Sequence, residues 1–111
     1  MEELKKLKCV PCEGGVDPMK SDEINKYLEL LQNDWKVLEE GKKIEFQFKF
    51  NNFKEAITFI NKVAKIAEEE GHHPNIYIDY SKVTITLWTH AIGGLSINDF
   101  VLATKIESIL N

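Results

Sequence analysis

All three histidines of the 111-residue chain lie in two short stretches whose residue types suit acid–base chemistry. His72 and His73 are adjacent, and His90 lies further along the chain. The unperturbed pKa of histidine is about 6.5, so an imidazole can take up and release protons near neutral pH. Two histidines in what must be a loop between Gly71 and Pro74 therefore indicate a general acid, a general base or both.

Two carboxylates accompany these histidines. Glu68 lies one helical turn before His72, close enough for a carboxylate to orient an imidazole. Asp99 follows His90 after a short loop and is expected at the same end of the molecule. Structural roles also account for both acids, because Asp99 stands at capping-box spacing after Ser96 and Glu68 belongs to a solvated acidic run.

Three helices are predicted from apolar residues that recur every three or four positions. The first begins near Ser21, which suits an N-cap. The second follows Asn52, three residues before Glu55 as in a capping box, and ends before Gly71. The third follows Ser96.

Two β-hairpins are predicted from the alternation of apolar and polar residues. The predicted strands cover residues 35–39, 42–50, 75–80 and 82–89, with turns at Glu40 and Gly41 and near Tyr80 and Ser81. Each strand has one apolar face, so a single layer of helices is enough to cover the sheet. We therefore predict an α+β domain with two layers, a four-stranded antiparallel sheet and three helices on one face, in the order αββαββα.

The second hairpin is expected to bring the histidines together. Antiparallel pairing places the residue before Asn75 alongside the residue after Thr89. His72 and His73 would then face His90, and neighbouring strands lie only about 4.8 Å apart. A histidine just past a helix end can serve merely to complement the helix dipole, but the convergence of all three favours a site.

Three further residues are candidates for contact with a substrate. Pro74 biases His73 toward an extended backbone, which carries it out of the helix. Trp88 shares one face of its strand with His90 by parity. Trp35 is the other tryptophan, and both indoles serve more often in packing than as ligand platforms.

No metal site is expected. Adjacent His72 and His73 would diverge in an extended segment, and no histidine spacing matches the i, i+4 pair of a helical zinc site. Cys9 and Cys12 form a single CxxC without a second pair, so we interpret them as incidental. Zinc shared between two copies of this segment is the alternative.

Residues 1–20 lack periodicity and are predicted to form a flexible tail before a single domain at residues 21–111. The net charge of −4, without a basic cluster, argues against nucleic-acid binding. No apolar run approaches the ~20 residues of a membrane span, and the first residues lack the apolar core of a signal peptide. We therefore expect a cytoplasmic protein without a membrane partner.

These residues resemble the pterin-4a-carbinolamine dehydratase family. The resemblance rests on Glu68, His72-His73-Pro74, an aromatic residue at Tyr77 or Tyr80, Thr89-His90, Gly94-Leu95-Ser96 and Asp99. It extends from about Trp35 to the C-terminus and includes the segment from Phe50 to Ala56.

The resemblance implies a lyase without a cofactor. Such an enzyme removes water from a 4a-hydroxytetrahydrobiopterin-type pterin and gives quinonoid dihydropterin, which is recycled after aromatic amino-acid hydroxylation. By similarity His72 and His90 are the acid–base candidates and His73 holds the substrate. Glu68 and Asp99 would support them, and which imidazole donates the proton stays open.

The resemblance also implies a homodimer or homotetramer, for which free strand edges provide a physical route. Two other functions are kept as alternatives: a pterin-binding protein in molybdopterin metabolism, and a dimerisation cofactor of a transcription factor that acts through protein interaction. Retention of the full histidine set argues against the second.

Overall fold

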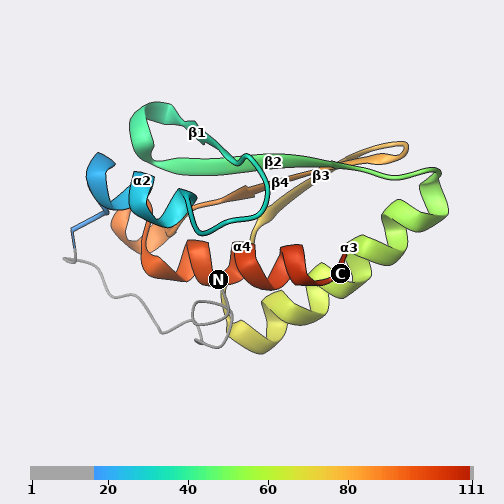
Figure 1. Cartoon of the computed structure of the whole chain (residues 1–111). Helices are drawn as coiled ribbons and strands as arrows, with labels where there is room; N and C mark the ends of the chain where they lie inside the picture. Colours follow the sequence, from blue (N-terminus) through green and yellow to red (C-terminus); the bar gives the residue numbers. More distant parts are fainter. Residues whose placement is uncertain (1–16, 111) are drawn as a thin grey trace.

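The structure, a computed structural model, describes residues 17–110 (Figure 1). Its helices are α2 (Ser21–Leu28), α3 (Phe53–Glu70) and α4 (Ile97–Ser108), its strands are β1 (Lys36–Leu38), β2 (Lys43–Lys49), β3 (Asn75–Asp79) and β4 (Lys82–Leu87), and its 3₁₀ turns are η1 (Glu39–Gly41) and η2 (His90–Ile92). Cys9 and Cys12 lie outside the described residues.

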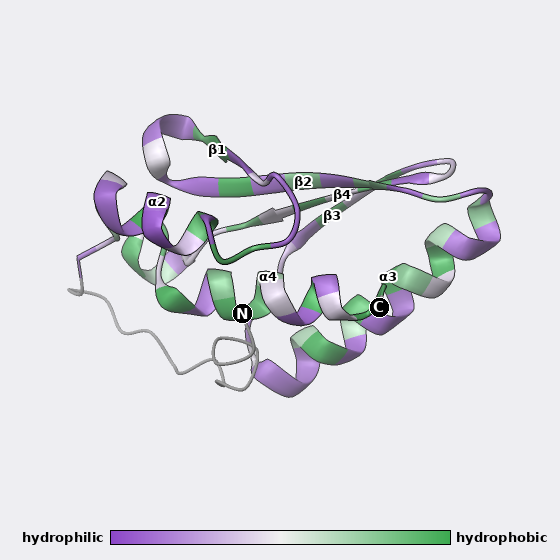
Figure 2. Ribbon diagram, viewed as in Figure 1, coloured by the Kyte–Doolittle hydropathy of each residue, from purple (hydrophilic) through white to green (hydrophobic). Residues whose placement is uncertain are grey.

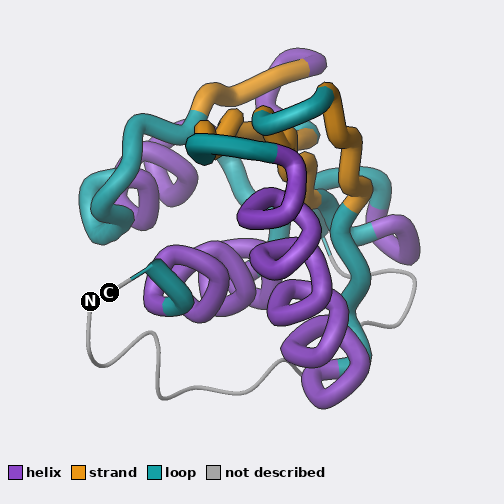
Figure 3. The backbone as a smooth tube through the Cα atoms, turned by 90° about the vertical axis from the view of Figure 1, so that its right-hand side faces the viewer, coloured by secondary structure: helices purple, strands orange, loops and turns teal. Residues whose placement is uncertain are grey.

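The four strands form one antiparallel sheet in the order β1-β2-β4-β3. The three helices lie on one side of this sheet, and Figure 3 shows the two layers end-on. The predicted α+β architecture and its element order are therefore confirmed.

Strand β2 shows why the sheet has two different faces. Ile44 and Phe48 are buried toward the helices, whereas Glu45 and Gln47 project from the opposite face, where they bond to threonines of β4. Figure 2 shows the same alternation of hydrophobic and hydrophilic residues along the strand. Period-two patterning thus fixes the register, because a slip of one residue would expose the apolar set.

Helix α3 is limited by specific contacts at both ends. Asn52 Oδ1 accepts a hydrogen bond from the Glu55 amide at 2.9 Å, while the Glu55 carboxylate accepts from the Asn51 amide at 3.2 Å. At the other end Gly71 has φ +67°, a left-handed conformation that glycine adopts without steric cost. The chain therefore leaves the helix directly before His72.

Helix α4 is buried on nearly all sides, from Asn98 to Thr104 and again at Ile106 and Glu107. Ser96 caps it, and Asp99 reaches back to the Ser96 amide, as the predicted capping box requires. The first turn of α4 is thus held rigidly beside the end of β4.

Several boundaries differ from the predictions, and each strand is shorter than predicted. Ser21 is the first residue of α2 and Lys20 occupies the N-cap position. Packing begins earlier still, because the Met19 amide donates to the Leu95 carbonyl at 2.8 Å. Strand β4 ends at Leu87, since beyond it the chain leaves the sheet toward η2.

Candidate active site

All three histidines line one pocket of about 390 Å³. Its walls come from two segments, residues 71–75 after α3 and residues 88–91 after β4, together with Asn98 of α4. Ligand pockets in proteins typically have volumes of about 300–1,000 Å³, so a small bicyclic molecule is compatible with this site.

The histidines meet by a route that differs from the prediction. Asn75 pairs with Thr86 instead of Thr89, because the hairpin closes tightly at Asp79 and Lys82. The predicted alignment was therefore wrong by three residues. His90 reaches the pocket because η2 turns the chain immediately after Thr89, whose amide donates to the Gly94 carbonyl at 2.8 Å.

His72 is held by a buried carboxylate. Its Nε2 lies 2.6 Å from Asp99 Oδ1, and the Asp99 side chain is 0% exposed. The second oxygen of Asp99 accepts from Thr89 Oγ1 and from the Ser96 amide, both at 2.9 Å. A carboxylate only accepts hydrogen bonds, so the His72 Nε2 carries a proton and Nδ1 is left for another partner.

His73 has a different environment. Its Nε2 lies 2.5 Å from Glu68 Oε2, but the two side chains are 59% and 77% exposed. Water screens such a pair, so it orients the ring and contributes little stability. The Glu68 carboxylate thus contacts His73 in this structure, whereas the sequence suggested that it would orient His72.

His90 packs against an indole. The rings of His90 and Trp88 have centroids 4.3 Å apart, and the Lys43 ammonium lies 4.1 Å from the centroid of the Trp88 ring. Trp88 therefore forms an aromatic wall of the pocket, as strand parity suggested. His90 itself is exposed.

Trp35 is not brought to this pocket. It is 3% exposed, packs against Phe46 and Phe48, and donates from Nε1 to Glu107 at 3.0 Å. Its aromatic surface is used in the core on the helical side of the sheet, so the structure gives it a packing role.

Some residues that build the site were not predicted as part of it. Thr89 and Ser96 hold Asp99, their hydroxyls lie 2.8 Å apart, and Asn98 lines the pocket although it is 2% exposed. The capping-box spacing of Ser96 and Asp99 was the available signal. The capping box accounts for the bond that Asp99 Oδ2 accepts from the Ser96 amide, whereas Oδ1 contacts His72.

No cluster of three or more histidine, cysteine, aspartate or glutamate side chains suited to a metal ion occurs within residues 17–110. Over the same range, no helix has the length and apolar character required to cross a membrane.

Comparison with known proteins identifies the family. The family described as pterin 4 alpha carbinolamine dehydratase matches residues 17–109. The chain belongs to this family. A relative from Rickettsia canadensis (strain McKiel) is 51% identical over 97% of this chain and 98% of its own, and one from Alkaliphilus metalliredigens (strain QYMF) is 47% identical over 96% of each. Both carry the family's dehydratase name provisionally.

Solved structures show the same fold as this member of the pterin dehydratase family. A transcriptional coactivator/pterin dehydratase from Brucella melitensis has a TM-score of 0.80 at 30% identity, over 86% of this chain and 100% of that one. A pterin dehydratase-like protein, identified as a RuBisCO assembly factor in the alpha-carboxysome, has a TM-score of 0.61 at 22% identity, over 70% and 90%. The second likeness concerns the fold alone.

Proposed function

We propose that this protein dehydrates a 4a-hydroxytetrahydropterin by acid–base catalysis with histidines. The observation that carries the proposal is the meeting of His72, His73 and His90 at one pocket, with His72 held by the buried Asp99. Family membership supports the same reaction.

The reaction needs one proton to be removed and one to be supplied. The base takes the proton from N5 of the pterin, the electron pair forms the C4a=N5 double bond, and the C4a–O bond breaks. The acid protonates the departing hydroxyl, which leaves as water. The atoms balance as loss of one water, so the pterin needs neither an oxidant nor a reductant.

The environments of the histidines suggest how these roles divide. Asp99 holds the His72 ring through its Nε2, which orients the Nδ1 of that ring to receive the proton from N5. His90 then acts as the acid, and the indole of Trp88 beside it provides a surface for the pterin ring. His73, oriented by Glu68, holds the substrate.

The experiment is to add the purified protein to a freshly generated 4a-carbinolamine pterin and to follow its decay by ultraviolet absorbance. We expect His72→Ala and His90→Ala each to lower turnover by at least about tenfold, because positioned acid–base groups typically contribute about 10²–10⁴-fold. Circular dichroism of both variants checks the fold. Full activity in both variants would refute the histidine mechanism. An inactive wild-type protein that still binds pterin would favour the pterin-binding alternative.

We also propose that the protein works as a homo-oligomer in the cytoplasm. Strand β3 is an edge strand of the sheet, and Ile76 and Tyr77 on it are exposed, which offers a surface for a second copy. Analytical ultracentrifugation tests this, and a monomer at micromolar concentration would contradict it.

A further inference from the structure

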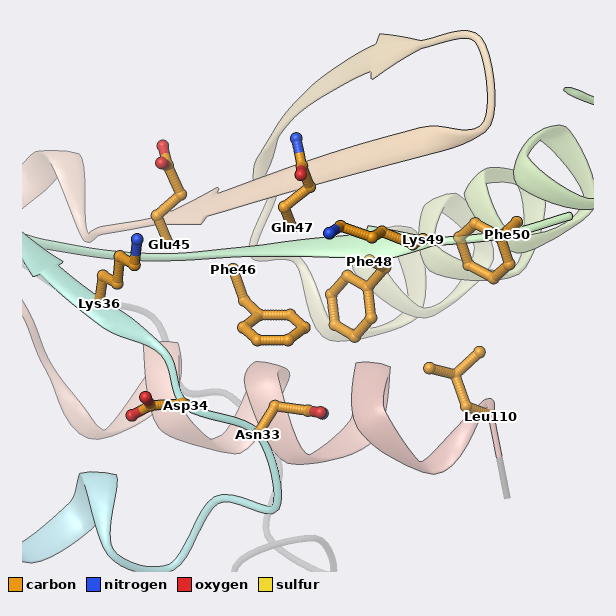
Figure 4. A pocket seen from close by; sticks show the side chains of 10 residues that line it. All are labelled: Asn33, Asp34, Lys36, Glu45, Phe46, Gln47, Phe48, Lys49, Phe50 and Leu110. Atoms are coloured by element: carbon orange, nitrogen blue, oxygen red, sulfur yellow. The ribbon is translucent and has the colours of Figure 1, made fainter. Parts of the chain in front are cut away.

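A large hollow in the described part of the chain lies away from the histidines, along the outer edge of β2. This groove, which we call the β2 groove, has a volume of about 750 Å³. Figure 4 shows its side chains: Phe46 and Phe48 point toward α4, and Leu110 from the end of that helix points back toward the strand. None of the residues that line it belongs to the histidine pocket.

The main chain of β2 is open along this groove. Strand β1 pairs with β2 only as far as Lys36 opposite Glu45, while β2 continues to Lys49. The Phe50 amide donates to Ser81 on the β4 side, and main-chain directions alternate along a strand. The amides and carbonyls of Gln47 and Lys49 therefore face outward, past the end of β1.

The floor of the groove is apolar. Phe46 and Phe50 are half-buried, Leu110 is 50% exposed, and Phe48 closes the bottom. A second hollow of about 330 Å³ shares Phe50 and Leu110 and continues toward α3. An open strand edge beside an apolar hollow is the arrangement that binds extended peptides by strand addition.

The charges around the groove select the kind of peptide. Four exposed lysines line the two hollows and have no ion-pair partner within residues 17–110: Lys36, Lys49, Lys54 and Lys62. Three carboxylates also line the hollows, Asp34, Glu45 and Glu55, of which Glu45 accepts a hydrogen bond from the Thr86 hydroxyl and Glu55 from the Asn51 amide. Lysines therefore outnumber carboxylates at the two hollows by four to three, a local positive excess although the whole chain has a net charge of −4.

We propose that the β2 groove binds an extended segment of a partner protein in which acidic residues alternate with apolar ones. The main chain of the segment pairs with Gln47 and Lys49, its apolar side chains enter the hollow beside Phe46 and Leu110, and its carboxylates meet the lysines. Pairing with the same edge of a second copy is disfavoured, because each copy would bring its own Lys36 and Lys49 to the contact.

The test uses the ¹⁵N-labelled protein and a synthetic peptide, N-acetyl-Glu-Leu-Glu-Phe-Glu-Leu-Glu-amide. We expect saturable chemical-shift changes in the groove and slower hydrogen exchange at the amides of Gln47 and Lys49. The amides of Phe46 and Phe48 already face β4, so their exchange should not change. Slower exchange at alternate residues of the strand is specific to strand addition.

Two control peptides separate the contributions. A peptide with lysine in place of every glutamate should bind at least about fivefold more weakly, since exposed ion pairs each contribute up to about that factor. A peptide N-methylated at the residues that face β2 should lose binding, because its edge donors are removed. Equal binding of the N-methylated peptide would overturn the proposal, as would failure of the acidic peptide to bind.

Variants locate the site. Lys49→Glu and Leu110→Asp should each weaken binding of the acidic peptide, whereas Lys65→Glu, a matched change on an exposed part of α3 outside both hollows, should not. Gln47→Pro removes an outward amide and blocks the edge, and proline is tolerated at an outward-facing edge position. Unchanged affinity in Lys49→Glu and Gln47→Pro together would also overturn the proposal.

Discussion

Replacing Asp99 with asparagine should abolish most of the proposed dehydratase activity without unfolding the protein. Asp99 accepts three hydrogen bonds, one from His72 on Oδ1 and two from Thr89 and Ser96 on Oδ2. The asparagine oxygen can keep the two bonds at the Oδ2 position. Its amide nitrogen, a donor, then faces the His72 Nε2, which also carries a proton.

This conflict is relieved when His72 moves its proton from Nε2 to Nδ1. The nitrogen that is proposed to receive the proton from N5 of the pterin is then already protonated. We expect kcat to fall about 10²–10⁴-fold, the full contribution of a general base, which corresponds to about 2.7–5.5 kcal/mol in the activation free energy. Loss of the charge-assisted bonds should lower the free energy of unfolding by only about 1–3 kcal/mol.

Stopped-flow ultraviolet decay of the 4a-carbinolamine measures kcat, and thermal denaturation measures the stability of the same sample. Thr89→Val is the matched control, because it removes one donor to Asp99 and leaves the proton on the His72 Nε2. That variant should lose less than about tenfold in kcat, since the base itself is retained. If Asp99→Asn keeps kcat within threefold of wild type, the assignment of His72 as the base is wrong.

Three other substitutions test separate parts of the structure. Glu107→Ala should lower the free energy of unfolding by about 3–5 kcal/mol, because the Trp35 Nε1, the Gln32 amide and two donors of Asn33 lose their acceptor; a loss under 1 kcal/mol in chemical denaturation would contradict this. Glu68→Gln should change kcat by less than about fivefold, since that carboxylate is exposed, and a hundredfold loss would show a direct role. Gly94→Ala should destabilise by about 1–3 kcal/mol, because its Cβ would lie 2.6 Å from the Pro18 Cβ; an unchanged melting temperature would show that the Pro18 segment moves aside freely.

Much of the fold follows from residue periodicity. Alternation in β2 and the stripe of α3 both have strong single-face patterns, and Asn52 and Gly71 mark the ends of α3 by their own backbone chemistry. These signals are local, so they can be recognised without knowledge of the tertiary structure. The limits of the second hairpin were less predictable, because Trp88 and Thr89 are residue types that favour a strand, although pairing with β3 ends at Thr86.

The site was predictable in part for the same reason. Connectivity brought the three histidines to one end of the sheet even though the register assumed for the hairpin was wrong, because η2 redirects the chain after Thr89. The position of Trp35 depends on Glu107, a partner 72 residues away that no local pattern joins to it. A signal for Glu107 did exist, since a charged residue at helical spacing from Phe100 and Ala103 interrupts an apolar face.

The hydrogen bond between the Met19 amide and the Leu95 carbonyl limits how far the protein can be shortened. Leu95 is 0% exposed, so its oxygen would lose a partner in a place that water reaches poorly. A recombinant form that starts at Ser21 should consequently loosen the turn that carries Ser96 and, with it, the support of Asp99. Cleavable tags are therefore better joined ahead of Pro18 than at the first turn of α2.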